Sequence, residues 1–393
     1  MSGLSGISGT RHVEVAVLGA GLMGACTAWA LARRGRSVAL IEAYEPGHRN
    51  GSSHGSERIF RRAYTDPFYA ALTGPAAESW QELEHDTGST LLRMTGAVDT
   101  GEAHIRDPAL IDAAMTTAGA EHEMLTPAQA HERWPFMLFD GPALYHAQAG
   151  TLDPDATIAA CVRRATELGA LILSGTRVTG TELLSSGAVR ILTHDRDHDD
   201  DQDHDDLDLT ADTVVIAAGA WLPELAPRLA TGSEGPLVLP PLTVVQKEVF
   251  HFRKRDPDAA WPTFVHKGPV QIYGMPSGTD AGPEPAVKVA RYDGGPLTTA
   301  STRDGLIDPV ARDSVCAYVR TRLPGLDPEP IAEASCLFTF APEEDFILDR
   351  HGPYVIVSPC SGHGAKFAPL IGELAADLAD RRAAPPARFA LPR

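Results

Sequence analysis

The sequence predicts an α/β protein in which a parallel sheet covered by helices is interleaved with an α+β part built on an antiparallel sheet. Three observations predict this class. A strand, a glycine turn, a helix and a second strand follow one another at the N-terminus, and similar buried patterns return within 153–218 and 354–378. Between them, residues 237–307 carry alternating strands with many Gly and Pro. At 393 residues, two connected domains are expected.

The N-terminal unit begins with a β-branched run at 13–18, which suits a buried parallel strand. The glycine turn GAGLMG follows, and then a helix-forming run that ends at Gly35. A second apolar strand at 37–42 ends in Glu42. Strand, glycines, helix, strand and acid in this order are the fingerprint of a dinucleotide-binding β-α-β unit.

Each residue of the fingerprint has a physical role. Gly19 permits the tight turn, Gly21 lets backbone N–H groups approach a pyrophosphate, and Gly24 lets the helix lie close on the strand. Glu42 is expected to accept hydrogen bonds from the ribose hydroxyls. The unit therefore predicts a bound adenine dinucleotide, and by itself it leaves FAD and NAD open.

The later elements follow from caps and periodicity. Asp153 and Pro154 begin a helix that Gly169 ends. We predict strands at 171–174, 176–180, 189–193, 207–210, 214–218, 243–252, 287–291 and 354–358, and a last helix at 369–378.

The charge balance disfavours a nucleic-acid partner, because 34 basic residues stand against 52 acidic ones and give a net charge of −18. Residues 194–208 hold nine Asp and one Arg, and we predict a solvated acidic loop insertion there. Its three histidines make a metal-binding tract the less favoured alternative, so no metal site is predicted.

The cysteines and the N-terminus bear on the compartment. Five widely spaced cysteines without a CxxC pair indicate neither a disulfide framework nor a structural zinc site. Residues 1–10 read as a flexible tail and not as a signal peptide. The uncharged stretch 15–32 approaches the length of a membrane span, but the glycine turn divides it. We expect a cytoplasmic protein with no membrane partner.

Six motifs in order along the chain carry a family resemblance. They are GAGLMG with Glu42, GSSHG at 51–55, RWP at 133–135, AAGAW at 217–221, CLFT at 336–339 with FILD at 346–349, and SGHGAKF at 361–367. The chain resembles the monomeric sarcosine oxidase and N-methyltryptophan oxidase family of flavoprotein amine oxidases over nearly its whole length. The resemblance implies a monomer with a discontinuous Rossmann-type FAD-binding domain (11–95, 150–232 and 332–385) and a substrate domain (96–149 and 233–331).

The resemblance also implies a reaction. An FAD-dependent oxidase of this family converts the secondary or cyclic amine of an amino acid to an imine, and O2 is reduced to H2O2. Arg61 and Lys366 match the family's carboxylate-binding positions, where fixed cations orient the substrate. Lys288 matches the lysine at the site of oxygen reaction, where a partly buried cation would stabilise superoxide-like charge.

The same resemblance implies contacts with the flavin. Cys336 matches the cysteine that bonds to the flavin 8α-methyl group, and because the thiolate is the nucleophile we expect its pKa to be lowered by nearby cations or by the flavin. His54 and Arg58 match residues near the flavin ring. Backbone N–H groups of the Gly362-His363-Gly364 turn would stabilise negative charge at N1 and the C2 carbonyl. Further cofactor contacts are implied at Ser52, Val178, Gly219 and Lys366, and His54 and Arg58 are also taken as candidate catalytic residues.

Departures from the family pattern concern the substrate. Arg291 and Tyr292 stand where sarcosine-oxidising relatives have an aromatic residue followed by His, and Tyr273 keeps only part of an aromatic pair. We therefore take Tyr273 and Arg291 as candidate pocket residues. The substrate is open among sarcosine, a bulkier N-methyl amino acid and a cyclic imino acid. Two alternatives are an NAD-dependent dehydrogenase and a non-catalytic FAD-binding protein that recruits a partner through its acidic insertion.

Overall fold

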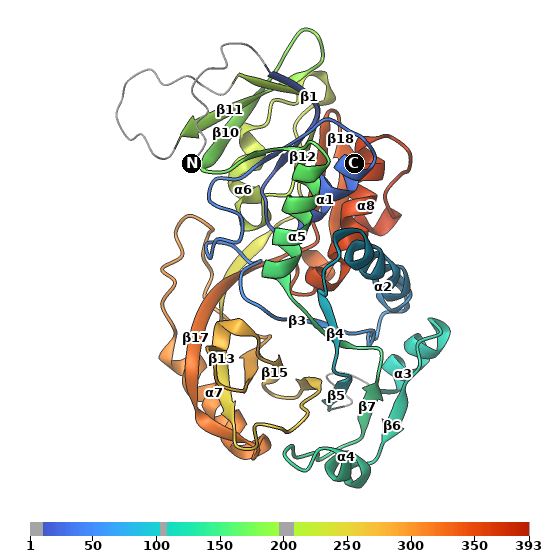
Figure 1. The fold of residues 1–393 in the computed structure, drawn as a ribbon, viewed down its shortest axis with the longest axis vertical. Helices are drawn as coiled ribbons and strands as arrows, with labels where there is room; N and C mark the ends of the chain where they lie inside the picture. The colour runs from blue at the N-terminus through green and yellow to red at the C-terminus, as the bar shows by residue number, and fades with distance from the viewer. Residues whose placement is uncertain (1–10, 103–107, 196–207, 393) are drawn as a thin grey trace.

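The computed structural model describes residues 11–102, 108–195 and 208–392. It contains two eight-stranded sheets and a three-stranded one. Figure 1 shows the parallel-rich sheet in the upper half of the molecule and the antiparallel sheet in the lower half, with β3 and β4 between them. The predicted fold class is confirmed.

The parallel-rich sheet contains the N-terminal unit as expected. Its strands are β1 (Arg11–Leu18), β2 (Val38–Ile41), β9 (Leu171–Leu173), β10 (Thr176–Leu183), β11 (Val189–Asp195), β12 (Leu209–Ile216), β18 (Ile347–His351) and β19 (Tyr354–Ser358). β1 pairs in parallel with β2 and with β12, and β12 pairs in parallel with β19. The strands β10 to β12 form the expected antiparallel meander.

One strand assignment from the sequence is wrong. The runs 207–210 and 214–218 were expected as two strands, but residues 209–210 and 214–216 of these runs lie on the single strand β12. The reason is pairing, because β12 stays in parallel register with β1 from the pair Arg11 and Leu209 to the pair Leu18 and Ile216. Residues 196–207, the core of the acidic insertion, lie outside the described residues, as does the tail 1–10.

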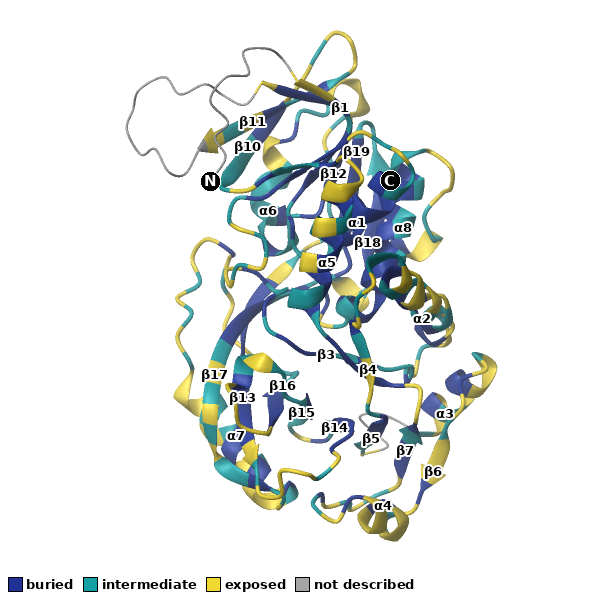
Figure 2. Cartoon of the chain, viewed as in Figure 1, coloured by how far each residue is buried: buried dark blue, intermediate teal, exposed yellow. Residues whose placement is uncertain are grey.

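Helices cover this sheet and build the main core. The α-helices of the described residues are α1 (Leu22–Arg33), α2 (Pro67–Thr87), α3 (Pro108–Thr117), α4 (Pro127–Arg133), α5 (Pro154–Glu167), α6 (Leu222–Leu225), α7 (Pro309–Arg322) and α8 (Ala368–Ala379). Figure 2 shows α1 largely buried beside α8. A Cβ at Gly372 of α8 would lie 2.7 Å from the backbone of Cys26, so glycine permits this close packing. The predicted cap of α5 is present, since Asp153 accepts a hydrogen bond from Ala156 N at 2.9 Å.

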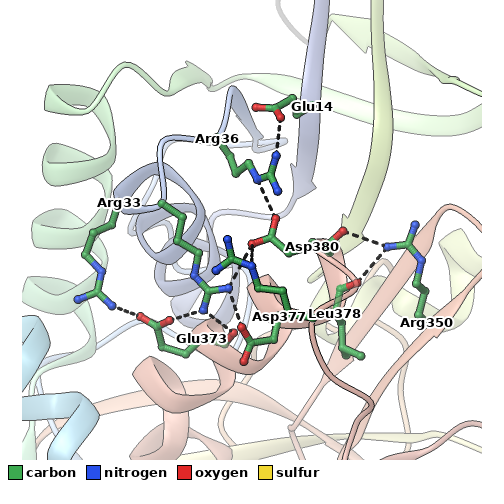
Figure 3. A network of polar contacts seen from close by, with 11 residues as sticks. Glu14, Arg33, Arg36, Arg350, Glu373, Asp377, Leu378 and Asp380 are labelled. Carbon is green, nitrogen blue, oxygen red and sulfur yellow. Dashed lines mark hydrogen bonds and ion pairs between the residues drawn. The ribbon is translucent and has the colours of Figure 1, made fainter.

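Ion pairs join the ends of α1 and α8 (Figure 3). Arg34 contacts Glu373 at 2.6 Å and Asp377 at 2.7 Å. Beyond the helix end, Arg36 contacts Asp380 at 2.8 Å. The side chain of Asp380 is only 2% exposed and has three arginines within 4 Å, so its charge is compensated from several sides.

This contact makes a stability prediction. Asp380→Ala should lower the free energy of unfolding by about 1.5–3 kcal/mol, because the charged hydrogen bonds that Arg34 and Arg36 donate to its buried carboxylate are lost. The measurement is the urea midpoint. Glu329→Ala is the matched control. The Glu329 side chain, which pairs with Arg312, is 72% exposed, so this ion pair should contribute about 0–1 kcal/mol to the free energy of unfolding. Equal shifts for the two variants would contradict the prediction.

The second sheet is antiparallel except where β14 pairs with β5. Its strands are β17 (Leu326–Phe340), β13 (Thr243–Lys254), β16 (Ala286–Arg291), β15 (Gln271–Pro276), β14 (Thr263–Lys267), β5 (Ala97–Gly101), β7 (Ala143–His146) and β6 (Glu123–Leu125). The expected strands 243–252 and 287–291 correspond to β13 and β16. The expected domain boundary at residue 332 falls inside β17. The connecting sheet pairs β8 (Gly150–Leu152) with β3 (Arg58–Phe60) and β4 (Leu92–Met94).

All five cysteines are free thiols, and Cys26, Cys161 and Cys316 are buried. Within the described ranges, no helix has the length and apolar character needed to cross a membrane. In the same ranges, His, Cys, Asp and Glu side chains form no group of three or more suited to a metal ion.

Candidate active site

A cavity of about 880 Å³ runs from the β1–α1 turn, past the ends of β12 and β3, to β16 and β17 of the antiparallel sheet. Most residues expected at the site line it: Gly19, Gly21, Glu42, Ser52, His54, Arg58, Arg61, Val178, Gly219, Tyr273, Lys288, Cys336, Gly362, His363, Gly364 and Lys366. Two expected residues, Gly24 and Arg291, are not in the lining.

The cavity begins at the glycine turn. Gly19 has φ of 99°, and a Cβ there would lie 2.6 Å from the carbonyl oxygen of Ala217, so the turn requires glycine. Gly24 lies beneath the turn, where a Cβ would be 1.8 Å from the carbonyl oxygen of Gly19. Its role is therefore packing, as expected. Glu42 accepts a hydrogen bond from Ala20 N at 2.7 Å, which fixes the acid beside the turn.

This end of the cavity fits an adenine dinucleotide. The first turn of α1 presents backbone N–H groups, and Ser53 Oγ accepts one of them, from Leu22 N at 3.0 Å. A helix N-terminus with glycine on its approach favours a pyrophosphate, and a buried carboxylate next to it favours ribose hydroxyls. His54 also lines the cavity. Burial and nearby cations lower its pKa to about 4, so the imidazole is neutral near pH 7. Its buried Nε2 has no hydrogen-bond partner in the structure.

Cys336 lies on β17 in the antiparallel sheet and is 5% exposed. Its pKa was expected to be lowered, and the structure gives the opposite direction. Burial of the thiol raises the pKa of Cys336, while the positive charges of Arg58 and Lys288 act against that rise. The nearby cations were predicted correctly, but the sequence motif does not show how deeply the thiol is buried.

Lys288 is 2% exposed, so the expectation of a buried cation is confirmed. Its Nζ donates to Asp280 Oδ2 at 2.7 Å. Burial is the main cause that lowers the pKa of Lys288, Arg58 adds to it, and Asp280 acts in the other direction. Asp280 also lines the cavity and was missed by the sequence analysis.

The expectation that Arg291 lines the pocket is wrong. Side chains alternate along a strand, so on β16 Lys288 faces the cavity and Arg291 faces the other side. There Arg291 pairs with Asp293 at 2.7 Å. Tyr292, the next residue, does line the cavity, and its hydroxyl donates to Glu344 Oε2 at 2.7 Å.

Two of the expected cations flank one phenol. Lys366 Nζ donates to Tyr64 OH at 3.0 Å, and the guanidinium carbon of Arg61 lies 5.2 Å from the centre of the Tyr64 ring. Tyr64 OH also contacts His363 Nδ1 at 3.0 Å. Burial and then the charge of Lys366 lower the pKa of His363 to about 3, so the imidazole is neutral near pH 7. The sequence analysis missed Tyr64, although it stands three residues after Arg61.

The Gly362-His363-Gly364 turn leads into the last helix in two steps. A 3₁₀ turn, Gly364–Phe367, comes first, and α8 follows from Ala368. Lys366 is in this turn, and its Nζ also donates to the carbonyl oxygen of His363 at 2.8 Å. These two hydrogen bonds hold the Lys366 side chain against its own turn and direct its ammonium group toward Tyr64.

Comparison with protein-family models gives a match over residues 14–378 to the DAO family, described as FAD dependent oxidoreductase. The chain belongs to this family. The match includes both the glycine turn and the segment 361–367, so it covers both ends of the cavity. The expected FAD site is therefore consistent with the family and with the residues present.

Relatives and solved structures agree with this assignment. The chain is 30% identical over 380 residues to a monomeric sarcosine oxidase of Streptomyces avermitilis, with 93% of each chain covered. It is 29% identical over 388 residues to an N-methyl-L-tryptophan oxidase of Yersinia pestis, covering 95% of this chain and 96% of the relative. NikD, a solved structure described as an unusual amino acid oxidase essential for nikkomycin biosynthesis, has a TM-score of 0.83 at 24% identity, covers 97% of this chain, and supports the fold.

The family and these relatives confirm the predicted enzyme class, an FAD-dependent oxidase of amine or amino-acid substrates. The alternative of an NAD-dependent dehydrogenase is wrong, because the family uses FAD. The alternative of a non-catalytic FAD-binding protein does not agree with relatives that are oxidases.

Proposed function

We propose that this enzyme oxidises a secondary or cyclic amino acid to its imine and reduces O2 to H2O2. The proposal rests on one observation, which is that the side chains of Arg61, Lys288 and Lys366 line the same cavity as Cys336. A carboxylate with an adjacent amine needs fixed cations at one end and a cofactor beside its α-carbon. The relatives named above act on sarcosine and N-methyl-L-tryptophan, which are both secondary amines with a carboxylate.

The residues present suit a particular arrangement of the cofactor. The turn from Gly19 to Gly24 and Glu42 would hold the adenosine diphosphate part, and Cys336 would hold the flavin covalently through its 8α-methyl group. His54, Arg58 and the Gly362-His363-Gly364 turn would contact the flavin ring. When bound, FAD supplies the two-electron acceptor for the C–N bond and the electron donor for O2.

The chain's own residues bind and orient the substrate. Arg61 and Lys366 hold the carboxylate, and both contact Tyr64. A positive charge near the substrate amine would lower the pKa of its ammonium group, which favours loss of the amine proton before oxidation. His363 stays neutral and does not add to the charge. Tyr273 and Tyr292 form the wall that limits the bulk of the amine substituent.

We further propose that the enzyme acts as a cytoplasmic monomer without nucleic-acid or membrane partners. Its five cysteines are free thiols, which suits a reducing compartment. The net charge of −18 opposes binding to nucleic acid. Sedimentation of the purified protein tests the monomer.

The flavin linkage makes a prediction that a spectrum checks. When the purified enzyme is precipitated with acid, the yellow colour should stay with the wild-type protein and leave the Cys336→Ala variant. Covalent attachment explains that difference, because acid unfolds the protein and releases FAD that is held only by contacts. Cys316→Ala is the matched control, since Cys316 is also a buried thiol but is outside the cavity lining, and its precipitate should stay yellow.

The reaction itself is tested by a peroxide-coupled screen of sarcosine, N-methyl-L-tryptophan and cyclic imino acids. Peroxide formed in step with amine consumption is the expected result. An FAD-loaded, folded enzyme that none of these amines bleaches would contradict the proposed substrate class.

A further inference from the structure

The surroundings of Lys288 are mostly unfavourable to a positive charge. The side chain is 3% exposed, so it has lost its hydration. Arg58 from β3 adds a second positive charge nearby. Cys336 from β17 is a thiol whose pKa burial raises, so it stays uncharged near pH 7. Besides Asp280, Lys288 Nζ contacts the carbonyl oxygen of Glu57 at 3.4 Å.

Two histidines also face this group and are neutral. His251 is the cross-strand partner of Lys288 on β13, and burial followed by the charge of Lys288 lowers its pKa to about 4. His54 lies in the loop after Ser53, and its pKa is also lowered to about 4. Neither imidazole therefore supplies a negative or a positive charge near pH 7, and the carboxylate of Asp280 is left as the counter-ion that contacts Lys288 Nζ.

Asp280 is itself held in place. It lies in the 3₁₀ turn Thr279–Ala281 and accepts a hydrogen bond from Ser56 Oγ at 2.5 Å, and a second from Ser56 N at 3.3 Å. The pKa of Asp280 lies well below its ordinary value, with burial opposing and Lys288 and Ser56 causing the fall. Asp155 is a further carboxylate on this side, and Gly55 N donates to it at 3.1 Å. The Asp280 carboxylate thus stays ionised and fixed.

We propose that Asp280 is the positioning residue for Lys288: its carboxylate keeps the buried ammonium group charged and holds it in the cavity wall. Without Asp280, the buried amine beside Arg58 would be driven to its neutral form. The inference rests on the proposed function, in which Lys288 acts where O2 reacts, but it concerns the charge of Lys288 and can be measured without turnover.

The composition of the chain supports a special need for this charge. Five of the 34 basic residues are lysine, at positions 247, 254, 267, 288 and 366, and the rest are arginine. Three of these five lysines line the cavity. Lysine is a compact charge that can gain and lose a proton, whereas arginine stays charged when buried. A lysine at position 288 therefore needs a partner that an arginine would not need.

The small number of lysines allows a direct measurement. FAD-loaded enzyme labelled with ¹³C at lysine Cε gives five resonances to follow by NMR, and Lys288→Met identifies the one from Lys288. In Asp280→Asn, the pKa of Lys288 is expected to fall by about 1–3 pH units, as loss of an opposite charge at this distance requires. Asp280→Glu keeps the charge and is expected to restore most of the wild-type value. Glu343→Gln, which removes an exposed carboxylate from the rim of the same cavity, should leave the Lys288 resonance unchanged.

A kinetic measurement separates positioning from a merely structural role. In wild type, the rate at which substrate-reduced enzyme reacts with O2 should fall as the pH rises and Lys288 loses its proton. In Asp280→Asn this fall should occur at a pH that is lower by the same 1–3 pH units. The rate of reduction by substrate should keep its pH profile. Asp280→Glu should return the O2 profile toward wild type.

The outcomes are distinguishable. A Lys288 resonance that titrates alike in wild type and Asp280→Asn would overturn the proposal, and so would a variant in which reduction by substrate shifts while the O2 profile does not. If Asp280→Asn fails to fold, the comparison of Asp280→Glu with Ser56→Ala decides, because Ser56→Ala should free the carboxylate and lower the pKa of Lys288 in the same direction. Absence of peroxide with every amine would instead contradict the proposed function, and the NMR titration would still report on the ion pair.

Discussion

Lys288→Met is expected to slow the reaction of substrate-reduced enzyme with O2 by about 10²–10³-fold, the usual effect of removing one preorganised charge from a developing anion. Methionine keeps the length and apolar stem of the side chain, so the wall of the cavity is largely retained. The first electron that reaches O2 creates a negative charge, and a buried cation stabilises it far more than water-exposed lysine would. Reduction by substrate creates no anion at this position and should change much less.

The two half-reactions are measured separately by stopped-flow absorbance, first with amine under nitrogen and then with O2. Lys254→Met is the matched control, because Lys254 is another lysine of the antiparallel sheet, but it is only half-buried, lies outside the cavity lining and donates to the carbonyl oxygen of Ala259. Its two rates should match wild type. Equal slowing of both half-reactions in Lys288→Met would point to a general disturbance of the cavity and against oxygen activation by Lys288.

The nucleotide end of the cavity was predictable because its determinants are contiguous in sequence. The glycine turn, α1 and Glu42 lie within one β-α-β unit, where strand pairing and helix packing leave little freedom. The cap at Asp153 was likewise predictable from two adjacent residues. Local rules were enough at both places.

The substrate end depended on information that a local pattern does not carry. Arg291 was assigned to the wrong face of its strand. An alternating pattern gives two sets of side chains, and the sequence does not say which set faces the cavity. Asp280 gave no signal, since it stands in a short turn eight residues before Lys288 and becomes a partner only when β15 and β16 pair. The pKa direction of Cys336 followed from burial, which depends on the whole sheet.

The break at residues 211–213 shows the same limit in the other direction. The residues between the two expected strands include Asp212, which is exposed, while its neighbours Ala211 and Thr213 are buried and stay in register with β1. One outward polar residue is compatible with a strand when pairing on both sides is continuous. Tertiary pairing thus overrode the local pattern.

Arg61→Met and Lys366→Met should each weaken binding of an amino-acid substrate by about 2–5 kcal/mol, which corresponds to about 30- to 4,000-fold in Kd. The reason is that each variant leaves the carboxylate with one cation in a site built for two. The measurement is the Kd from the amine dependence of enzyme reduction, for a substrate and for its analogue without the carboxylate. The analogue should bind with little change, since it never used these cations.

The double variant decides whether the two cations act on one group. If Arg61 and Lys366 hold the same carboxylate, their effects are coupled, and the double variant should lose less than the product of the two single losses. Arg62→Met is the matched control, because Arg62 is the adjacent arginine but donates to Gln148 Oε1 and is not in the cavity lining, so its Kd should stay near wild type. Independent, multiplicative losses would mean that the two cations contact different groups of the substrate. An equal loss for the analogue would mean that they shape the cavity and do not bind the carboxylate.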